Sequence, residues 1–165
     1  MRSRLLISLL CVLSAAVVLA QESVNQQGLF KYTAVPGFKR DDARNPQSGV
    51  SFWAKFKDGF AANIGIVNAN AGGQTSQALG AMMVKQMRAT PNMVVTSHGA
   101  AKLGGADGYY IEGVRTEGKL KLGVLMILGV RKGTMVGVHA LDLTSRSPAM
   151  FKKVRESLKS FVWQN

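Results

Sequence analysis

The stretch from Asp107 to Thr144 constrains the fold of this chain more than any other part of its sequence. Read with a period of two residues, it contains three apolar segments that can form strands: Tyr109–Thr116, Lys119–Arg131 and Thr134–Thr144. The dipeptides Glu117-Gly118 and Lys132-Gly133 separate them, and a glycine in the second position accepts the positive φ of a tight two-residue turn. The stretch therefore predicts an antiparallel meander.

Both faces of this meander are apolar at their centres. If both turns hold two residues, one face carries Tyr109, Ile111, Leu120, Leu122, Val124, Met126, Leu128, Val130, Met135, His139, Leu141 and Leu143. The other face carries Tyr110, Leu125, Ile127, Val136, Val138 and Ala140, with Lys119, Lys121, Arg131 and Asp142 towards its ends. A sheet with one solvated face would alternate more cleanly, so both faces should be covered. We therefore expect an α+β fold: an α/β/α sandwich with a central antiparallel sheet.

The segments around the meander supply the remaining elements. In chain order we expect a first strand, a hairpin, a helix and a long strand before the meander, and a helix after it. The first strand is placed at Leu29–Pro36, the hairpin at Val50–Phe56 with Ala62–Val67, and the long strand at Asn92–Leu103. The first helix runs from Thr75 or Ser76 to Thr90. The last helix begins at a capping Ser147, with Pro148 in its first helical position.

The first of these helices has an apolar stripe that is rich in methionine: Leu79, Met82, Met83, Gln86 and Met87. Such a stripe can form an adaptable binding surface, but at helical spacing it is more typical of a core. We therefore predict that it packs on the sheet.

The beginning of the chain has the pattern of an export signal. Arg2 and Arg4 precede the apolar run Leu5–Leu19, and small residues end at Ala20, where a signal peptidase would cleave. The run is shorter than the roughly 20 residues of a membrane-spanning helix. The residues before Cys11, the only cysteine, lack the small residue that precedes a lipidated cysteine. We predict a cleaved signal peptide over 1–20, a flexible tail over 21–28, a single domain over 29–165, and a periplasmic or secreted protein that is not a lipoprotein.

The chain is strongly basic. Its formal net charge is +12, of which Arg2 and Arg4 contribute two, so +10 remains beyond the signal. Basic side chains gather on the last helix (Lys152, Lys153, Arg155 and Lys159) and in the polar segment Gly37–Gly49 after the first strand, which we expect to be a solvated loop (Lys39, Arg40 and Arg44). For an exported chain this charge predicts an envelope protein or an anionic surface as the partner, not nucleic acid. A generally basic surface without a dedicated partner is the alternative.

Residues for catalysis or metal binding are sparse. The two histidines, His98 and His139, have no suitably placed acidic neighbour, so the sequence predicts no metal site and no cofactor. His139 reads as a core histidine bonded to a neighbouring group. The serines Ser145 and Ser147 lack the elbow pattern of a serine hydrolase, and the pair Asp41-Asp42 suits a turn or an ion pair. We predict that the protein is not an enzyme.

The order of elements resembles that of the PsbP-like superfamily, which includes a photosystem accessory protein, the Ran-binding Mog proteins and bacterial envelope proteins similar to the DcrB lipoprotein. The resemblance spans Leu29 to Phe161 and is carried by three segments: Phe60-Ala61-Ala62-Asn63-Ile64-Gly65-Ile66, Gly104–Tyr110 and Leu158-Lys159-Ser160-Phe161. It implies an α/β/α sandwich that binds other proteins or assemblies and has no shared active site. No segment here matches the docking residues of those relatives, so their partners are not transferred.

Together these features predict an exported, non-enzymatic accessory protein of the bacterial envelope that binds another protein. One alternative is a carrier of a lipid or other apolar ligand, held in a pocket between the helix over 75–89 and the sheet. The other alternative is a hydrolase with an unrecognised site.

Overall fold

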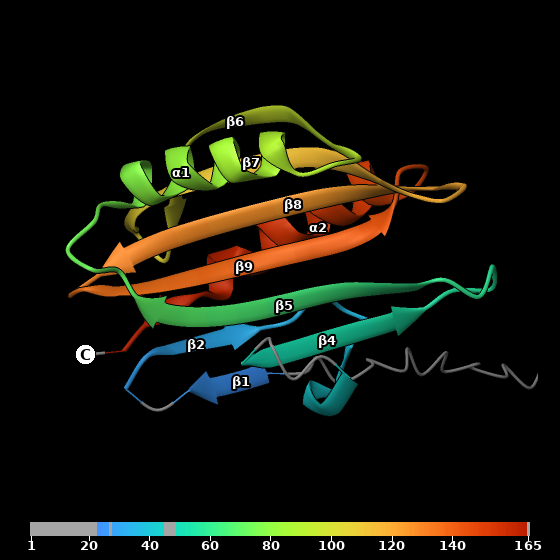
Figure 1. Cartoon of the computed structure of the whole chain (residues 1–165). Coiled ribbons are helices and arrows are strands. Elements are labelled where there is room, and N and C mark those ends of the chain that lie inside the picture. Colours follow the sequence, from blue (N-terminus) through green and yellow to red (C-terminus); the bar gives the residue numbers. More distant parts are fainter. Residues whose placement is uncertain (1–22, 27, 45–48, 165) are drawn as a thin grey trace, which may run out of the picture.

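The computed structural model describes residues 23–26, 28–44 and 49–164. The predicted signal peptide lies outside these residues. Within them, the strands form two antiparallel sheets, a large one in the order β3-β4-β5-β9-β8-β7-β6 and a small one in the order β1-β2-β10 (Figure 1). The strands are β1 (Ser23–Gln26), β2 (Phe30–Thr33), β3 (Lys39–Arg40), β4 (Val50–Lys55), β5 (Ala61–Asn70), β6 (Met93–Leu103), β7 (Ala106–Glu117), β8 (Leu120–Arg131), β9 (Thr134–Leu143) and β10 (Val162–Trp163).

The predicted meander is present as β7, β8 and β9, and the long strand β6 extends it at the edge of the sheet. The hairpin of β4 and β5 joins the other side, where β5 runs antiparallel to β9. The central antiparallel sheet of the α+β prediction is therefore confirmed.

The first turn of the meander differs by one residue from the prediction. Glu117 pairs with Leu120, so the two loop residues are Gly118 and Lys119. Gly118 has a φ of +58° in the first loop position, where a type II′ turn requires a positive φ. This shift moves the pairing of β7 with β8 by two residues. Because two residues are one full period of a strand, every side chain keeps its predicted face.

Two α-helices cover opposite faces of the large sheet, as predicted (Figure 1). The helix α1 (Ser76–Ala89) packs on the face of β7 and β8 that carries Tyr109 and Leu128. The helix α2 (Ser147–Ser157) packs on the other face, against Leu125, Ile127 and Val138. A short 3-10 helix, Leu158–Ser160, follows α2. No helix among the described residues is long and apolar enough to span a membrane.

The small sheet shares the α2 face with that helix. Phe30 and Tyr32 of β2 are buried with Phe52 and Phe161, and the rings of Phe30 and Phe161 stack at a centroid distance of 5.2 Å. The indole Nε1 of Trp163 donates a hydrogen bond of 2.7 Å to the carbonyl oxygen of Leu103. The predicted first strand is therefore present in part, but it belongs to this second sheet.

Two predictions for the N-terminal half are wrong. The expected tail contains strand β1, whose four residues pair with β2 and whose Val24 side chain is only 4% exposed. Backbone pairing holds this polar strand, so hydrophobic periodicity does not detect it. The basic segment Lys39–Arg44 was expected as a loop, but it forms the edge strand β3 and a 3-10 helix, Asp42–Arg44. The rest of that loop, residues 45–48, lies outside the described part.

The helix α1 begins as expected, because the hydroxyl of Thr75 accepts a hydrogen bond of 3.2 Å from the amide of Ala78. Its buried residues are Ser76, Leu79, Gly80 and Val84. The predicted methionine stripe is only partly correct, since Met82 is 43% exposed while Met83 packs against the core. The cause is the close approach of α1 at Gly80, where a Cβ atom would overlap the ring of Tyr109.

The start of α2 also differs from the prediction. Arg146 holds the capping position, no side chain caps the helix, and Ser147 is a buried first residue of the helix itself. Pro148 lies in the first turn, as its fixed φ favours. The Arg146 side chain pairs with Asp142 instead.

The ring of His139 provides a pH prediction. It lies opposite Met126 of β8 and Gly65 of β5. The hydrogen bond predicted for this ring is absent among the described residues. Burial alone lowers the pKa of His139 below its usual value. The unfolded chain therefore binds a proton on His139 at a higher pH than the folded protein does. As a result, the free energy of unfolding decreases as the pH falls through about 6.5, the pKa of a histidine in the unfolded chain.

We expect the urea midpoint of the wild type to fall more between pH ~7.5 and ~5.5 than that of His139→Gln, because glutamine does not titrate. Equal decreases in the two proteins would contradict this assignment. The carboxylates contribute equally to both proteins, so the difference between the two slopes isolates His139.

Candidate binding groove

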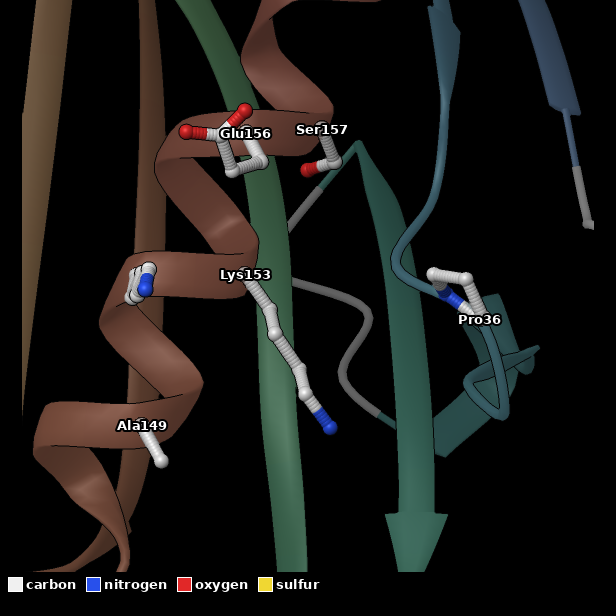
Figure 2. Close-up of a pocket in the computed structure, with 6 residues that line it drawn as sticks. Pro36, Ala149, Lys153, Glu156 and Ser157 are labelled. Atoms are coloured by element: carbon white, nitrogen blue, oxygen red, sulfur yellow. The ribbon is translucent and has the colours of Figure 1, made fainter.

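Two hollows of about 620 and 390 Å³ lie side by side on the α2 face of the molecule and share Pro36, Ala149 and Lys153. One wall is α2, and the other is the segment that joins β2 to β3 and includes Pro36 (Figure 2). We call the two hollows together the α2 groove. The sequence separation of its walls shows that only the folded chain creates it.

Most of the lining of the α2 groove is apolar. Val35 and Phe38 come from the segment after β2, Ala54 from the end of β4, Phe56 from just after β4, and Met150 from α2. Val35, Phe38 and Met150 are also part of the main hydrophobic core, so their positions are fixed by packing. The groove is therefore an extension of the core that is open to solvent, and it suits an apolar group.

A network around Arg146 closes one end of the α2 groove. Its guanidinium forms an ion pair of 2.7 Å with Asp142, a second ion pair with Asp58, and a stacking contact at 4.0 Å from the ring centre of Phe56. The hydrogen bonds with Asp142 raise the pKa of Arg146 above its usual value. The amide of Leu143 also donates to Asp142, at 2.8 Å. These contacts fix the Arg146 side chain at this end of the groove, where the paired carboxylates balance its charge.

Lysines line the open side of the α2 groove. Lys152 and Lys153 are exposed and border it, and Figure 2 shows the Lys153 side chain extending into the space between α2 and the segment with Pro36. Lys55 lines the second hollow. Among the described residues, no carboxylate lies within ion-pair distance of these three ammonium groups.

The one acidic residue at the first hollow, Glu156, forms an ion pair with a lysine that does not line the groove. Glu156 pairs with Lys159 at 2.6 Å, which lowers the pKa of Glu156, with a smaller effect from Lys152. Figure 2 shows the Glu156 carboxylate turned away from Pro36. The side that faces the groove is therefore left with an excess of positive charge.

The structure separates the basic residues that the sequence grouped together. Lys152 and Lys153 line the α2 groove, whereas Arg155 pairs with Glu112 on another flank of α2 and Lys159 pairs with Glu156. Of the earlier basic segment, Lys39 lies in β3, Arg40 pairs with Asp42 at 2.6 Å, and Arg44 stacks on Trp53 at 4.1 Å from the ring centre. Neither hollow of the groove is lined by these last three residues.

Sequence reasoning missed Lys55 and Arg146 as groove residues. Lys55 ends a predicted strand, and Arg146 precedes the predicted helix, so both stood at positions where charged residues are common. One signal was available for Arg146: Asp142 lies four residues earlier, at the end of a strand face whose centre is apolar, and an acidic side chain that is buried there needs a partner.

The residues considered for catalysis do not assemble into one site. Ser145 lines the α2 groove, His98 lies at α1, and His139 lies within the sheet. Asp42 accepts hydrogen bonds from Arg40 and from the amide of Ser51, and the first of these lowers its pKa. No group of three potential metal ligands occurs among the described residues.

The pocket expected between α1 and the sheet is a smaller cleft of about 330 Å³ at the edge of the helix. It is lined by Ala81, Val84, Lys85, Arg88, His98 and Tyr109, and no methionine contributes to it. The larger apolar hollow lies on the opposite face, under α2.

No protein-family model matches the chain, and no curated protein sequence matches it significantly. Solved structures do match it. LpqN of Mycobacterium tuberculosis, described as involved in cell envelope biogenesis, superposes with a TM-score of 0.70 and 11% identity over 88% of this chain and 91% of LpqN. Cyanobacterial PsbP (CyanoP) from Synechocystis sp. PCC 6803 gives a TM-score of 0.65 and 12% identity over 90% of this chain and 95% of CyanoP.

A third structure, the protein PA94 of unknown function from Pseudomonas aeruginosa, described as a putative regulator, gives a TM-score of 0.55 and 11% identity over 80% of this chain and 92% of PA94. These identities are too low to transfer an activity, but each match covers at least 80% of this chain and at least 91% of the other. The large antiparallel sheet, the helix on each face and these matches establish that this protein has a PsbP-like fold.

Proposed function

We propose that this protein is an exported, non-enzymatic accessory protein of the bacterial envelope, and that it binds an extended acidic segment of another envelope protein in the α2 groove. The observation that carries the proposal is the combination of an apolar groove with three lysines that form no ion pair among the described residues. Apolar side chains of the partner would occupy the hollows, and its carboxylates would pair with the lysines.

The chemistry of the α2 groove supports binding. Neither histidine lines the groove, and its two carboxylates pair with cations: Asp142 with Arg146 and Glu156 with Lys159. Within the described part of the chain, no hydrogen bond joins either carboxylate to the hydroxyl of Ser145 or Ser157, so neither serine is activated as a nucleophile. The apolar residues and exposed lysines of the groove are instead suited to recognise an amphipathic partner, since buried apolar anchors supply affinity and charged rims supply specificity.

The export pattern at the start of the sequence and the fold both support an envelope role. The similar structure LpqN is described as involved in cell envelope biogenesis, and CyanoP carries the same fold in a photosynthetic bacterium. In a compartment outside the cytoplasm, the net charge of the chain favours acidic partners over basic ones.

Site-specific photo-cross-linking tests this proposal. A photoreactive residue at position 149, in the groove, should cross-link a defined envelope protein, whereas the same residue at position 119, in the turn between β7 and β8, should not. The cross-linked segment, identified by mass spectrometry, should contain acidic and apolar residues. Equal products at both positions, or a segment without acidic residues, would refute the proposal.

The charge contribution is measured with the purified segment as a labelled peptide. Lys152→Gln/Lys153→Gln should weaken its binding by about 3- to 30-fold, because each exposed ion pair contributes about 0.3–1 kcal/mol. The control variant Lys119→Gln/Lys121→Gln removes the same charge elsewhere and should bind like the wild type. Affinity should fall as salt rises, since screening shortens to about 3 Å at 1 M. A small-molecule mass retained in native mass spectrometry, and lost on extraction, would identify a carrier instead.

A further inference from the structure

We propose a second binding site, for a phosphate group, in the cleft at the edge of α1. We call it the α1 cleft; it has a volume of about 330 Å³ and its polar residues are Lys85, Arg88, His98 and Tyr109. It lies on the face of the large sheet opposite the α2 groove, so it is independent of the function proposed above. The proposal rests on the direction of its hydrogen bonds and on its charge.

The backbone brings these residues together from three elements. Lys85 and Arg88 lie on the last turns of α1, His98 lies on β6, and Tyr109 lies on the adjacent strand β7 (Figure 1). The close packing of Gly80 against the Tyr109 ring holds α1 near the sheet. The rings of His98 and Tyr109 stack with centroids 6.0 Å apart, so the polar edge of the cleft is held by packing.

The hydrogen bonds in the α1 cleft run in one direction. The Arg88 guanidinium lies 3.4 Å from His98 Nε2, and His98 Nδ1 lies 2.8 Å from the Tyr109 hydroxyl. Arginine can only donate, so both contacts are satisfied by the His98 tautomer that accepts at Nε2 and carries its proton on Nδ1. That proton is donated to the Tyr109 oxygen, and the Tyr109 hydroxyl hydrogen is left to donate to another group. In this tautomer the chain of hydrogen bonds ends in an exposed hydroxyl that can donate to a bound acceptor.

The charge of the α1 cleft is also unbalanced. No acidic residue lines it, and neither Lys85 nor Arg88 lies within ion-pair distance of a carboxylate in the described part of the chain. The nearest acid in sequence to Tyr109 is Asp107, which pairs with Lys102 at 2.5 Å. The bond from Arg88 to His98 is long, so the guanidinium can turn to a stronger acceptor.

A phosphate oxyanion matches this arrangement. Its several acceptor oxygens can take hydrogen bonds from Arg88, from the Lys85 ammonium and from the Tyr109 hydroxyl together, and arginine recognises phosphate with two parallel bonds. The apolar residues Ala81 and Val84 would contact the group that carries the phosphate. The same chemistry is presented by free phosphate and by the headgroup of an anionic phospholipid.

The two histidines allow a direct test by NMR. The chain contains only His98 and His139, so the ring signals of the full protein give one reporter in the α1 cleft and one internal control within the sheet. Titration with inorganic phosphate should shift the His98 signals to saturation and leave those of His139 unchanged. A second arm uses vesicles of phosphatidylglycerol in phosphatidylcholine, with pure phosphatidylcholine vesicles as the blank.

Saturation with phosphate supports a site for a free phosphate group, and a response only to the phosphatidylglycerol vesicles supports a headgroup site. Arg88→Gln should weaken the response about tenfold, because it removes a charge-assisted donor. Tyr109→Phe, which keeps the ring against Gly80, should weaken it about fivefold. Lys119→Gln/Lys121→Gln should match the wild type. No saturable shift in either arm, or equal affinities for wild type and Arg88→Gln, would overturn the proposal.

Discussion

Replacing Leu128 with alanine is expected to lower the free energy of unfolding by about 2–5 kcal/mol, as is typical for a leucine that leaves a cavity in a core. Leu128 is 0% exposed in β8 and packs with Leu79 of α1 and Ala71. It therefore holds the first helix on the sheet. The loss includes the transfer free energy of the removed methyl groups and the cost of the cavity that remains beneath α1.

Urea unfolding measures this loss, and Leu120→Ala provides the matched control. Leu120 begins the same strand but is 46% exposed, so its truncation should change stability by about 0.5 kcal/mol or less. If Leu128→Ala had the unfolding midpoint of the wild type, Leu128 could not be a core contact between α1 and the sheet.

Replacing Arg146 with alanine is expected to lower the free energy of unfolding by about 3 kcal/mol, the lower end of the range for breaking a buried ion pair. Asp142 is 1% exposed, and without the guanidinium it keeps only the amide of Leu143 among its hydrogen-bond partners at the described residues. The Arg146 side chain is itself partly exposed, which lowers the estimate within that range. The contact of Arg146 with the Phe56 ring is lost as well.

Arg155→Ala is the control for the Arg146 prediction, since both arginines belong to α2 or its cap and both pair with an acid. The pair of Arg155 with Glu112 is more exposed, so its loss should cost about 0–1 kcal/mol. The double variant Arg146→Ala/Asp142→Asn should regain part of the stability, because the buried charge is removed. Equal losses for Arg146→Ala and Arg155→Ala would contradict a special role of Asp142.

Much of the fold was readable from the sequence because its signals are local. Alternation along 107–144 predicted both faces of the meander, and the faces remained correct although the first turn starts one residue later, at Gly118. Thr75 and Thr90-Pro91 predicted the ends of α1. Strand β1 was missed, because three of its four residues are polar and its backbone pairing with β2 leaves no apolar pattern in its own sequence.

The candidate sites were less predictable. The helical pattern placed Lys152, Lys153, Arg155 and Lys159 together, but acidic partners far away in the sequence or on the same helix occupy the last two. The α2 groove joins Pro36 to Ala149, and the α1 cleft joins Arg88 to Tyr109. A pattern of neighbouring residues in the sequence does not indicate that such distant segments lie side by side.

By itself, the sequence determined the apolar faces of the sheet, the two helices and the basic character of the chain, since each depends on residues that are neighbours along the chain. The tertiary structure decided which cations remain without a partner. The order of the strands and the packing of each helix set the distances between charges of distant segments, and an ion pair requires atoms within a few ångströms of one another. That packing leaves Lys152 and Lys153 at one groove and Lys85 and Arg88 at the other cleft, whereas Arg146 and Arg155 are joined to acidic residues.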